Sequence, residues 1–158
     1  MSAKRAVEHM LALSEKSDDP INLCISSPGG HIDSGDMLHD MIKFIDPKMR
    51  CIGSGWGASA GALIFIGAAL KNCYCLPNMR FLLHQPSSGI GGQASDMKIQ
   101  AEQIRQMRSR FEGLFAAATG QTPQKIAQDT KLDFWLTSEA AISYGLVGQI
   151  VSSYDALE

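Results

Sequence analysis

The chain has little net charge and no long apolar run. Its 14 Lys and Arg and 16 Asp and Glu leave a formal net charge of -2. A nucleic-acid-binding surface needs a concentration of positive charge, and this composition gives no reason to expect one. The longest apolar stretch, residues 60–70, contains two glycines and is too short to cross a bilayer. We therefore expect neither nucleic acid nor a membrane as a partner.

Pairs of cysteine or histidine at metal-binding spacing are also missing. Two of the four cysteines, Cys73 and Cys75, form C-x-C rather than C-x-x-C, and no histidine pair accompanies them. All four, including Cys24 and Cys51, lie in apolar, strand-like segments, so we expect buried free thiols, no metal and no cofactor. The N-terminus is typical of an amphipathic helix rather than a secretory leader, which favours the cytoplasm.

At 158 residues and 45% hydrophobic content, the chain is long enough for one domain over residues 1–158 with a real core. Strand-like and helix-like segments alternate through the first half, which predicts parallel βαβ units in an α/β domain. The patterns predict strands at 21–26, 49–53, 72–76, 79–83 and 147–151, and helices at 3–16, 34–45, 62–70, 94–118, from Pro123 and at 138–145.

Ser59 is the residue that stands out chemically. It lies in Gly57-Ala58-Ser59-Ala60-Gly61, between a strand-like run and a helix-like run. Free N–H groups at a helix N-terminus favour developing negative charge, and small neighbours let a substrate backbone approach. The alternative is that these small residues serve only to pack a strand closely against a helix.

A nucleophilic serine needs a base, and the chain has four histidines. His84 follows a strand-like segment, where catalytic groups of α/β sheets lie. The alternative for His84 is a satisfied histidine at a loop entrance. His9 and His39 fall in helix-like segments, and we expect His39 on the surface; His31 follows Gly30 in a loop.

Two aspartates could orient that base. Asp129 and Asp133 lie near the end of the helix that opens at Pro123, and the apolar residues after Asp133 would shield its carboxylate from water. The alternative is a surface charge at a helix end. An oxyanion hole needs two N–H donors, for which Ala60 and Gly30 are candidates.

The chain contains, in order, the motifs SSPGG (26–30), residues 35–47, GWGASAGAL (55–63), CLPNMRFLLHQP (75–86), GGQASD (91–96), TGQT (119–122), DTKLDFWLTSEA (129–140) and YGLV (144–147). Taken together, these motifs resemble the proteolytic subunit of the Clp protease, the peptidase family of ClpP type, over nearly the whole chain.

The resemblance implies a serine endopeptidase that hydrolyses unfolded polypeptides and small peptides without a cofactor. It implies that Ser59 is the nucleophile, His84 the general base and Asp133 the orienting acid. It further implies that the N–H groups of Gly30 and Ala60 form the oxyanion hole.

The resemblance also implies a crotonase-like α/β spiral with a protruding strand-helix handle over about 87–118. Family members form heptameric rings that stack through the handles as a tetradecamer, and an AAA+ unfoldase of the ClpX or ClpA type delivers substrates. The family's N-terminal axial loop and opening strand are expected to lie outside the sequence given.

Several residues depart from the family pattern. Asn22 and Cys24 stand where aromatic residues help to form the unfoldase pocket, although Phe44 is kept, so the resemblance does not extend to the whole docking rim. Leu132 replaces an arginine that takes part in contacts between rings.

Ala60 replaces a methionine that lines the P1 pocket, and Trp56 is unusual and could refill the space. We therefore expect a changed P1 preference. Together the departures suggest a divergent paralogue. Two other functions remain open: a structural partner subunit that assembles with an active paralogue, and a crotonase-type acyl-CoA enzyme.

Overall fold

The computed structural model describes residues 2–45, 48–86 and 91–157. The expected turn at Asp46-Pro47 and most of the glycine-rich segment 87–92 lie outside the described residues. The helices and strands, in chain order, are α1 Ala3–Ser14, β1 Ile21–Ser27, α2 Ile32–Ile45, β2 Met49–Ala58, α3 Ala60–Phe65, η1 Leu70–Asn72, β3 Cys73–Cys75, β4 Arg80–Leu83, α4 Ala94–Thr119, α5 Pro123–Asp129, β5 Phe134–Thr137, α6 Ser138–Tyr144, β6 Gln149–Ile150 and η2 Tyr154–Ala156.

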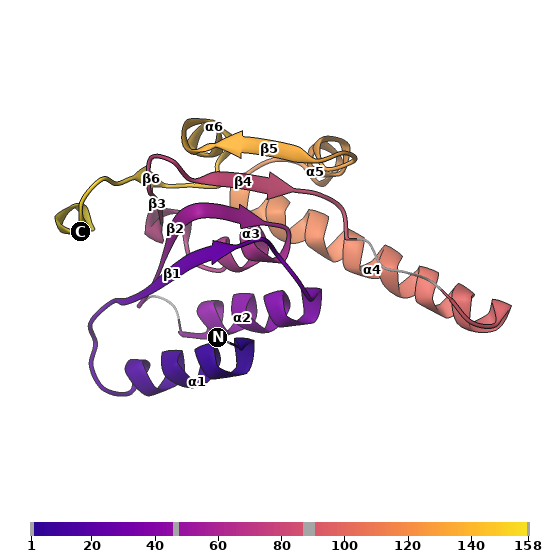
Figure 1. Ribbon diagram of the computed structural model, residues 1–158, viewed down its shortest axis with the longest axis horizontal. Helices are drawn as coiled ribbons and strands as arrows, with labels where there is room; N and C mark the ends of the chain where they lie inside the picture. The colour runs from indigo at the N-terminus through magenta and orange to yellow at the C-terminus, as the bar shows by residue number, and fades with distance from the viewer. Residues whose placement is uncertain (1, 46–47, 87–90, 158) are drawn as a thin grey trace.

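The described strands form one curled sheet in the order β5-β4-β2-β3-β6, with β1 also paired to β2 (Figure 1). The pairs β1–β2, β2–β3, β2–β4 and β3–β6 are parallel, whereas β5 runs antiparallel to β4. The predicted α/β fold with parallel units is confirmed. Because β2 pairs with three strands, its register sets the position of most of the sheet.

Three elements differ from the expectation. Strand β2 continues to Ala58, because Trp56–Ala58 pair with β4 although glycine flanks Trp56. Tertiary pairing here overrides weak strand propensity. Helix α3 ends at Phe65, short of the expected 62–70. Strand β5 has no counterpart in the prediction, because four residues at the edge of a sheet carry too little periodicity to be detected.

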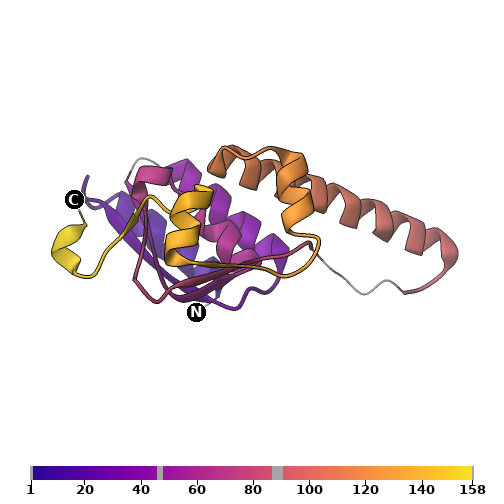
Figure 2. The same ribbon diagram turned by 90° about the horizontal axis from the view of Figure 1, so that it is seen from above.

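The helices cover one face of the sheet and leave the other open (Figure 2). On β4 the side chains of Phe81 and Leu83 face the helices and are fully buried, whereas Arg80 and Leu82 alternate toward the open face. Phe65 and Phe81 meet edge to face with ring centroids 5.0 Å apart. The core therefore lies between the sheet and its helical layer.

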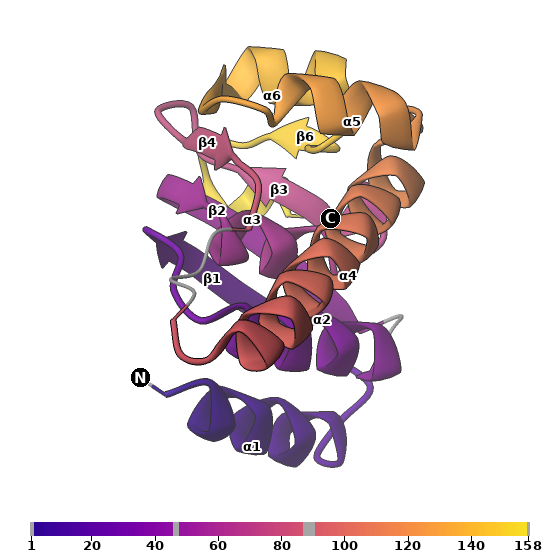
Figure 3. The same cartoon turned by 90° about the vertical axis from the view of Figure 1, so that its right-hand side faces the viewer.

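Helix α4 extends well beyond the sheet (Figures 1 and 2), and its projecting end faces the viewer in Figure 3. Its C-terminal half packs through Phe111, Phe115 and Ala116, while its first two turns are exposed. An ion pair between Arg110 and Asp36 ties this helix to α2. Among the described residues, no helix combines the length and the apolar character needed to cross a membrane.

Gly145 supplies the first test of the fold. It ends α6 with φ +86°, and a Cβ there would overlap the Thr119 carbonyl. We expect Gly145→Ala to lower the free energy of unfolding by more than the ~1–2 kcal/mol that a left-handed alanine costs, measured by urea unfolding followed by circular dichroism.

Gly113→Ala is the matched control, because Gly113 lies inside α4 and its Cβ would meet nothing within 4 Å. That change should raise the free energy of unfolding by ~1 kcal/mol, since alanine favours the helix. Equal effects of the two substitutions would contradict the packing described for Gly145.

Candidate active site

Ser59 occupies a strained turn between β2 and α3. Its φ of +53° is the one positive φ of a residue other than glycine in the described part of the chain. Two hydrogen bonds hold it there: the Ser59 N–H donates to the Leu82 carbonyl at 2.8 Å, and its carbonyl accepts from the Leu63 N–H at 3.1 Å. Such strain persists only where the surroundings enforce it, and it is typical of functional sites.

The glycine turn after β1 lies directly against this serine. Gly29 has φ +99°, and a Cβ there would lie 2.9 Å from the Ser59 Cβ and 2.9 Å from the Ala58 carbonyl oxygen. A Cβ added to Gly61 would likewise lie only 3.0 Å from the carbonyl oxygen of Ser27. Only residues without side chains allow β1, β2 and α3 to meet at this point.

Gly30 and Ala60, the two expected oxyanion donors, line the same pocket of about 320 Å³. Within the described residues the Gly30 N–H has no hydrogen-bond partner, and Ala60 is the first residue of α3, where N–H groups lack intrahelical partners. Because α3 has six residues rather than the expected nine, individual N–H groups matter here more than a helix dipole.

The sheet register brings His84 and Asp133 together. Leu83 pairs with Phe134 in the antiparallel β4–β5 ladder, so His84 and Asp133 are the next residues across from each other. Both line one pocket of about 520 Å³. Ser59 follows the β2 segment that pairs with β4 and therefore lies at the same end of the sheet.

The three side chains do not form a relay in this structure. In the described part of the chain, no hydrogen bond joins Ser59, His84 and Asp133; instead the His84 Nδ1 lies 3.0 Å from the Gln85 carbonyl oxygen. Asp133 is exposed, so the expected shielding of its carboxylate is wrong, because it precedes a strand at the edge of the sheet.

Asp129, the other candidate acid, is already engaged. Lys125 Nζ donates to both of its carboxylate oxygens, at 2.7 and 2.5 Å, and the Tyr144 hydroxyl donates to Oδ2 at 2.7 Å. Burial would raise the pKa of Asp129, but these hydrogen bonds outweigh it and hold the pKa below 3.8. Asp129 is therefore a structural carboxylate that fixes α5 to α6.

Two expectations about exposure are wrong. His39 is 2% exposed rather than on the surface, because α4 and the segment after α3 pack over that side of α2. Cys24 is exposed, because alternate side chains of β1 point to the open face. Cys51, Cys73 and Cys75 are buried free thiols, and burial raises the pKa of each.

The described residues hold no group of three or more His, Cys, Asp or Glu side chains placed to bind a metal ion. The sequence contains no C-x-x-C, and how its four histidines are arranged in space could be read only from the structure. His9 and His31 are both exposed, on α1 and in the loop before α2.

The open face of the sheet carries a cluster that the sequence did not indicate. Trp56 lies beside Arg80 in the β2–β4 pair, and the Arg80 guanidinium lies 5.5 Å from the Trp135 ring. Trp56 is not among the residues that line the Ala60 pocket, so the expectation that it refills that space is wrong. The sequence signal that could have revealed part of this cluster is the alternation of side chains along β4, which places Arg80 on the same face as His84.

Comparison with known proteins gives a consistent result. A family model described as Clp protease matches residues 1–154. The ATP-dependent Clp protease proteolytic subunit of Paracoccus denitrificans is 60% identical over 156 residues, which is 99% of this chain and 78% of that protein. Proteolytic subunit 3 of Rhizobium meliloti (strain 1021) is 54% identical over 96% of this chain and 77% of that protein.

Among solved structures, the ClpP1 N165D mutant from Listeria monocytogenes superposes with a TM-score of 0.91 at 42% identity, covering 99% of this chain and 87% of that chain. A second structure, ClpP1 from Listeria monocytogenes, gives a TM-score of 0.87. These likenesses confirm the expected spiral fold. The chain belongs to the Clp protease family, of which it is a serine-type proteolytic subunit.

Proposed function

We propose that the chain hydrolyses peptide bonds through Ser59, His84 and Asp133. The observation that carries this proposal is the register of the sheet, which sets His84 across from Asp133 at the strand ends where Ser59 turns into α3. Ser59 Oγ attacks the scissile carbonyl while His84 Nε2 accepts its proton, and Asp133 accepts the Nδ1–H and stabilises the imidazolium. His84 then protonates the leaving amine, and water hydrolyses the acyl-enzyme.

The Gly30 and Ala60 N–H groups donate to the oxyanion of the tetrahedral intermediate. Their shared pocket and the unpartnered Gly30 N–H support this role. Because these donors belong to backbone held by the Gly29–Ser59 contact, they need no rearrangement when charge develops.

Activation requires one local change at His84. Its Nδ1 contacts the Gln85 carbonyl, and the ring must exchange this contact for Asp133. Gln85 is itself anchored, because its N–H donates to the Thr130 carbonyl at 3.3 Å. We infer that the described conformation is a resting arrangement, and that assembly or substrate binding moves the ring into the relay.

The assembly proposed for the chain is the family's: two heptameric rings stacked as a tetradecamer, enclosing a chamber for unfolded polypeptides. The projecting half of α4 supports self-association, because Met97 and Ile99 are exposed large apolar residues on it. This helix and the segment before it correspond to the proposed handle, in a single domain over residues 1–158.

An AAA+ unfoldase of the ClpX or ClpA type is the proposed source of substrate. Phe44 is 78% exposed at the end of α2 and supports a docking contact. Asn22 donates through Nδ2 to the Tyr154 hydroxyl at 3.3 Å, and Cys24 is exposed, so this part of the rim is more polar than an aromatic one. Free thiols are typical of a reducing compartment, so a cytoplasmic location stays a prediction.

A changed P1 preference is a further proposal, because Ala60 lies next to Ser59.

The nucleophile is tested with a fluorophosphonate probe, which reacts with activated serines. Wild-type protein should be labelled and Ser59→Ala should not, with peptide hydrolysis falling by roughly 10⁴- to 10⁶-fold. Ser54→Ala is the control, because Ser54 lies on the same strand away from the pockets. Undiminished labelling of Ser59→Ala would refute the assignment.

The acid is tested by comparing two aspartates. Asp133→Asn should reduce kcat by about 10⁴-fold, because an amide cannot hold the imidazole in the required tautomer. Asp129→Asn removes the charge and one of the two oxygens that accept from Lys125 and Tyr144, so it should lower stability while leaving kcat within a few-fold. Similar losses of kcat in both variants, each folded by circular dichroism, would remove Asp133 from the relay.

The second candidate, a partner subunit with little activity alone, is favoured by Leu132, which is 80% exposed next to Asp133. For the leading proposal we expect the purified chain to cleave small fluorogenic peptides and to sediment as a tetradecamer. A silent protein of smaller mass, whose activity appears only on mixing with an active paralogue, would favour the partner role.

A further inference from the structure

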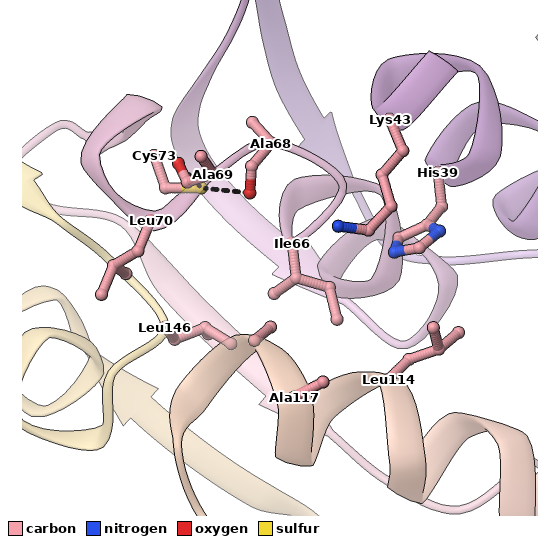
Figure 4. Close-up of a pocket in the computed structure, with 11 residues that line it drawn as sticks. His39, Lys43, Ile66, Ala68, Ala69, Leu70, Cys73, Leu114, Ala117 and Leu146 are labelled. Atoms are coloured by element: carbon pink, nitrogen blue, oxygen red, sulfur yellow. Dashed lines mark hydrogen bonds between the residues drawn. The ribbon is translucent and has the colours of Figure 1, made fainter. Parts of the chain in front are cut away.

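A cavity of about 290 Å³ lies on the helical side of the molecule (Figure 4), and none of its lining residues also lines either active-site pocket. Helix α2, the end of α3, the segment before β3 and helix α4 form its walls. Most of the lining is apolar, contributed by Ile66, Ala68, Leu70, Leu114, Ala117 and Leu146. An apolar cavity of about 150 Å³ already holds a molecule the size of benzene, so this one has room for a small organic ligand.

One side of the cavity is polar. His39 and Lys43, one turn apart on α2, both line it, and Figure 4 shows them facing the same space from the side away from Leu70 and Leu146. His39 is 2% exposed, yet only its Nδ1 is bonded, to Asp40 Oδ1 at 3.2 Å. The other ring nitrogen, Nε2, has no partner in the part of the chain that the structure describes.

This ring nitrogen is open to the cavity rather than sealed from solvent, so a molecule in the cavity can bond to it. When Asp40 accepts the Nδ1–H of His39, the other nitrogen, Nε2, accepts a hydrogen bond in the neutral ring and donates one in the imidazolium. Lys43 adds a positive charge at the same end.

Cys73 also lines the cavity but supplies no reactive group. Its Sγ contacts the carbonyl oxygens of Phe65 and Ala69, each at 3.5 Å, and burial raises its pKa to about 12. The thiol therefore stays neutral, and the polar groups available in this apolar cavity are the Lys43 ammonium and the His39 ring nitrogen.

We propose that this cavity binds a small aliphatic carboxylic acid, with its carboxylate between Lys43 and His39 and its alkyl tail against Leu114, Ile66 and Leu146. The charge of the polar end is complementary to the carboxylate, and the apolar walls fit a chain of a few methylenes. The bound acid joins α2 to the C-terminal half of α4, so it stabilises the attachment of that projecting helix. This site does not depend on the proposed catalytic residues.

Calorimetric titration of the whole protein with sodium octanoate tests the proposal. We expect saturable binding, with affinity rising about three- to fourfold per methylene from butanoate to octanoate. Octanol, which has the same tail without the charge, should bind more weakly. Occupancy should also raise the midpoint of thermal unfolding, because the ligand binds only the folded state.

Lys43→Gln should weaken octanoate by about tenfold or more, through loss of a charge-assisted hydrogen bond. Ala117→Phe should abolish binding by filling the chamber. Lys71→Gln, at an exposed lysine outside the lining, should leave affinity unchanged. If Ala117→Phe does not fold, Lys43→Gln still decides.

Absence of saturable binding by any of these acids, or equal affinity in wild type and Lys43→Gln, would overturn the proposal. The proposal would also be overturned if wild type bound no octanoate and Ala117→Phe changed the assembled mass. The cavity would then belong to a contact between copies of the chain.

Discussion

The close contact between Gly29 and Ser59 fixes the rest of the site. It forces the end of β1 against the turn from β2 into α3, and the hydrogen bond from Ser59 to Leu82 ties that turn to β4. The backbone strain at Ser59 accompanies these contacts, since such strain persists only where the surroundings enforce it. The same contact carries the Gly30 and Ala60 N–H groups to one pocket, so the donors and the hydroxyl share a single rigid support.

The sheet then extends this arrangement across three strands. Strand β2 holds the serine turn, β4 leads to His84, and the antiparallel edge strand β5 begins after Asp133. A shift of one residue between β4 and β5 would move the acid to the wrong face, since side chains alternate along a strand. The buried residue Leu136 on β5 opposes such a shift, because it would expose that side chain. Core packing on one face thus sets the position of polar groups at the strand ends.

Local signals predicted the helices well. The cap at Thr122 before Pro123 and the left-handed glycines 120 and 145 mark helix ends that short-range chemistry determines. The sequence motifs also supplied the candidate residues Ser59, His84 and Asp133, whose catalytic roles stay a proposal. Burial was harder: His39 was expected on the surface, and its burial could not be read from α2 because the helix that covers it comes from much later in the chain.

By itself, the sequence determined the composition of the core, the alternation of strands and helices, and the small residues around Ser59. Those properties depend on side-chain size, polarity and spacing, which are local. Only the tertiary structure decided that residues 134–137 form an edge strand, that Asp129 binds Lys125 and Tyr144 while Asp133 lies with His84, and that His39 faces a cavity. Each of these depends on pairing or packing between segments far apart in the chain, where the free energy of burial outweighs local preference.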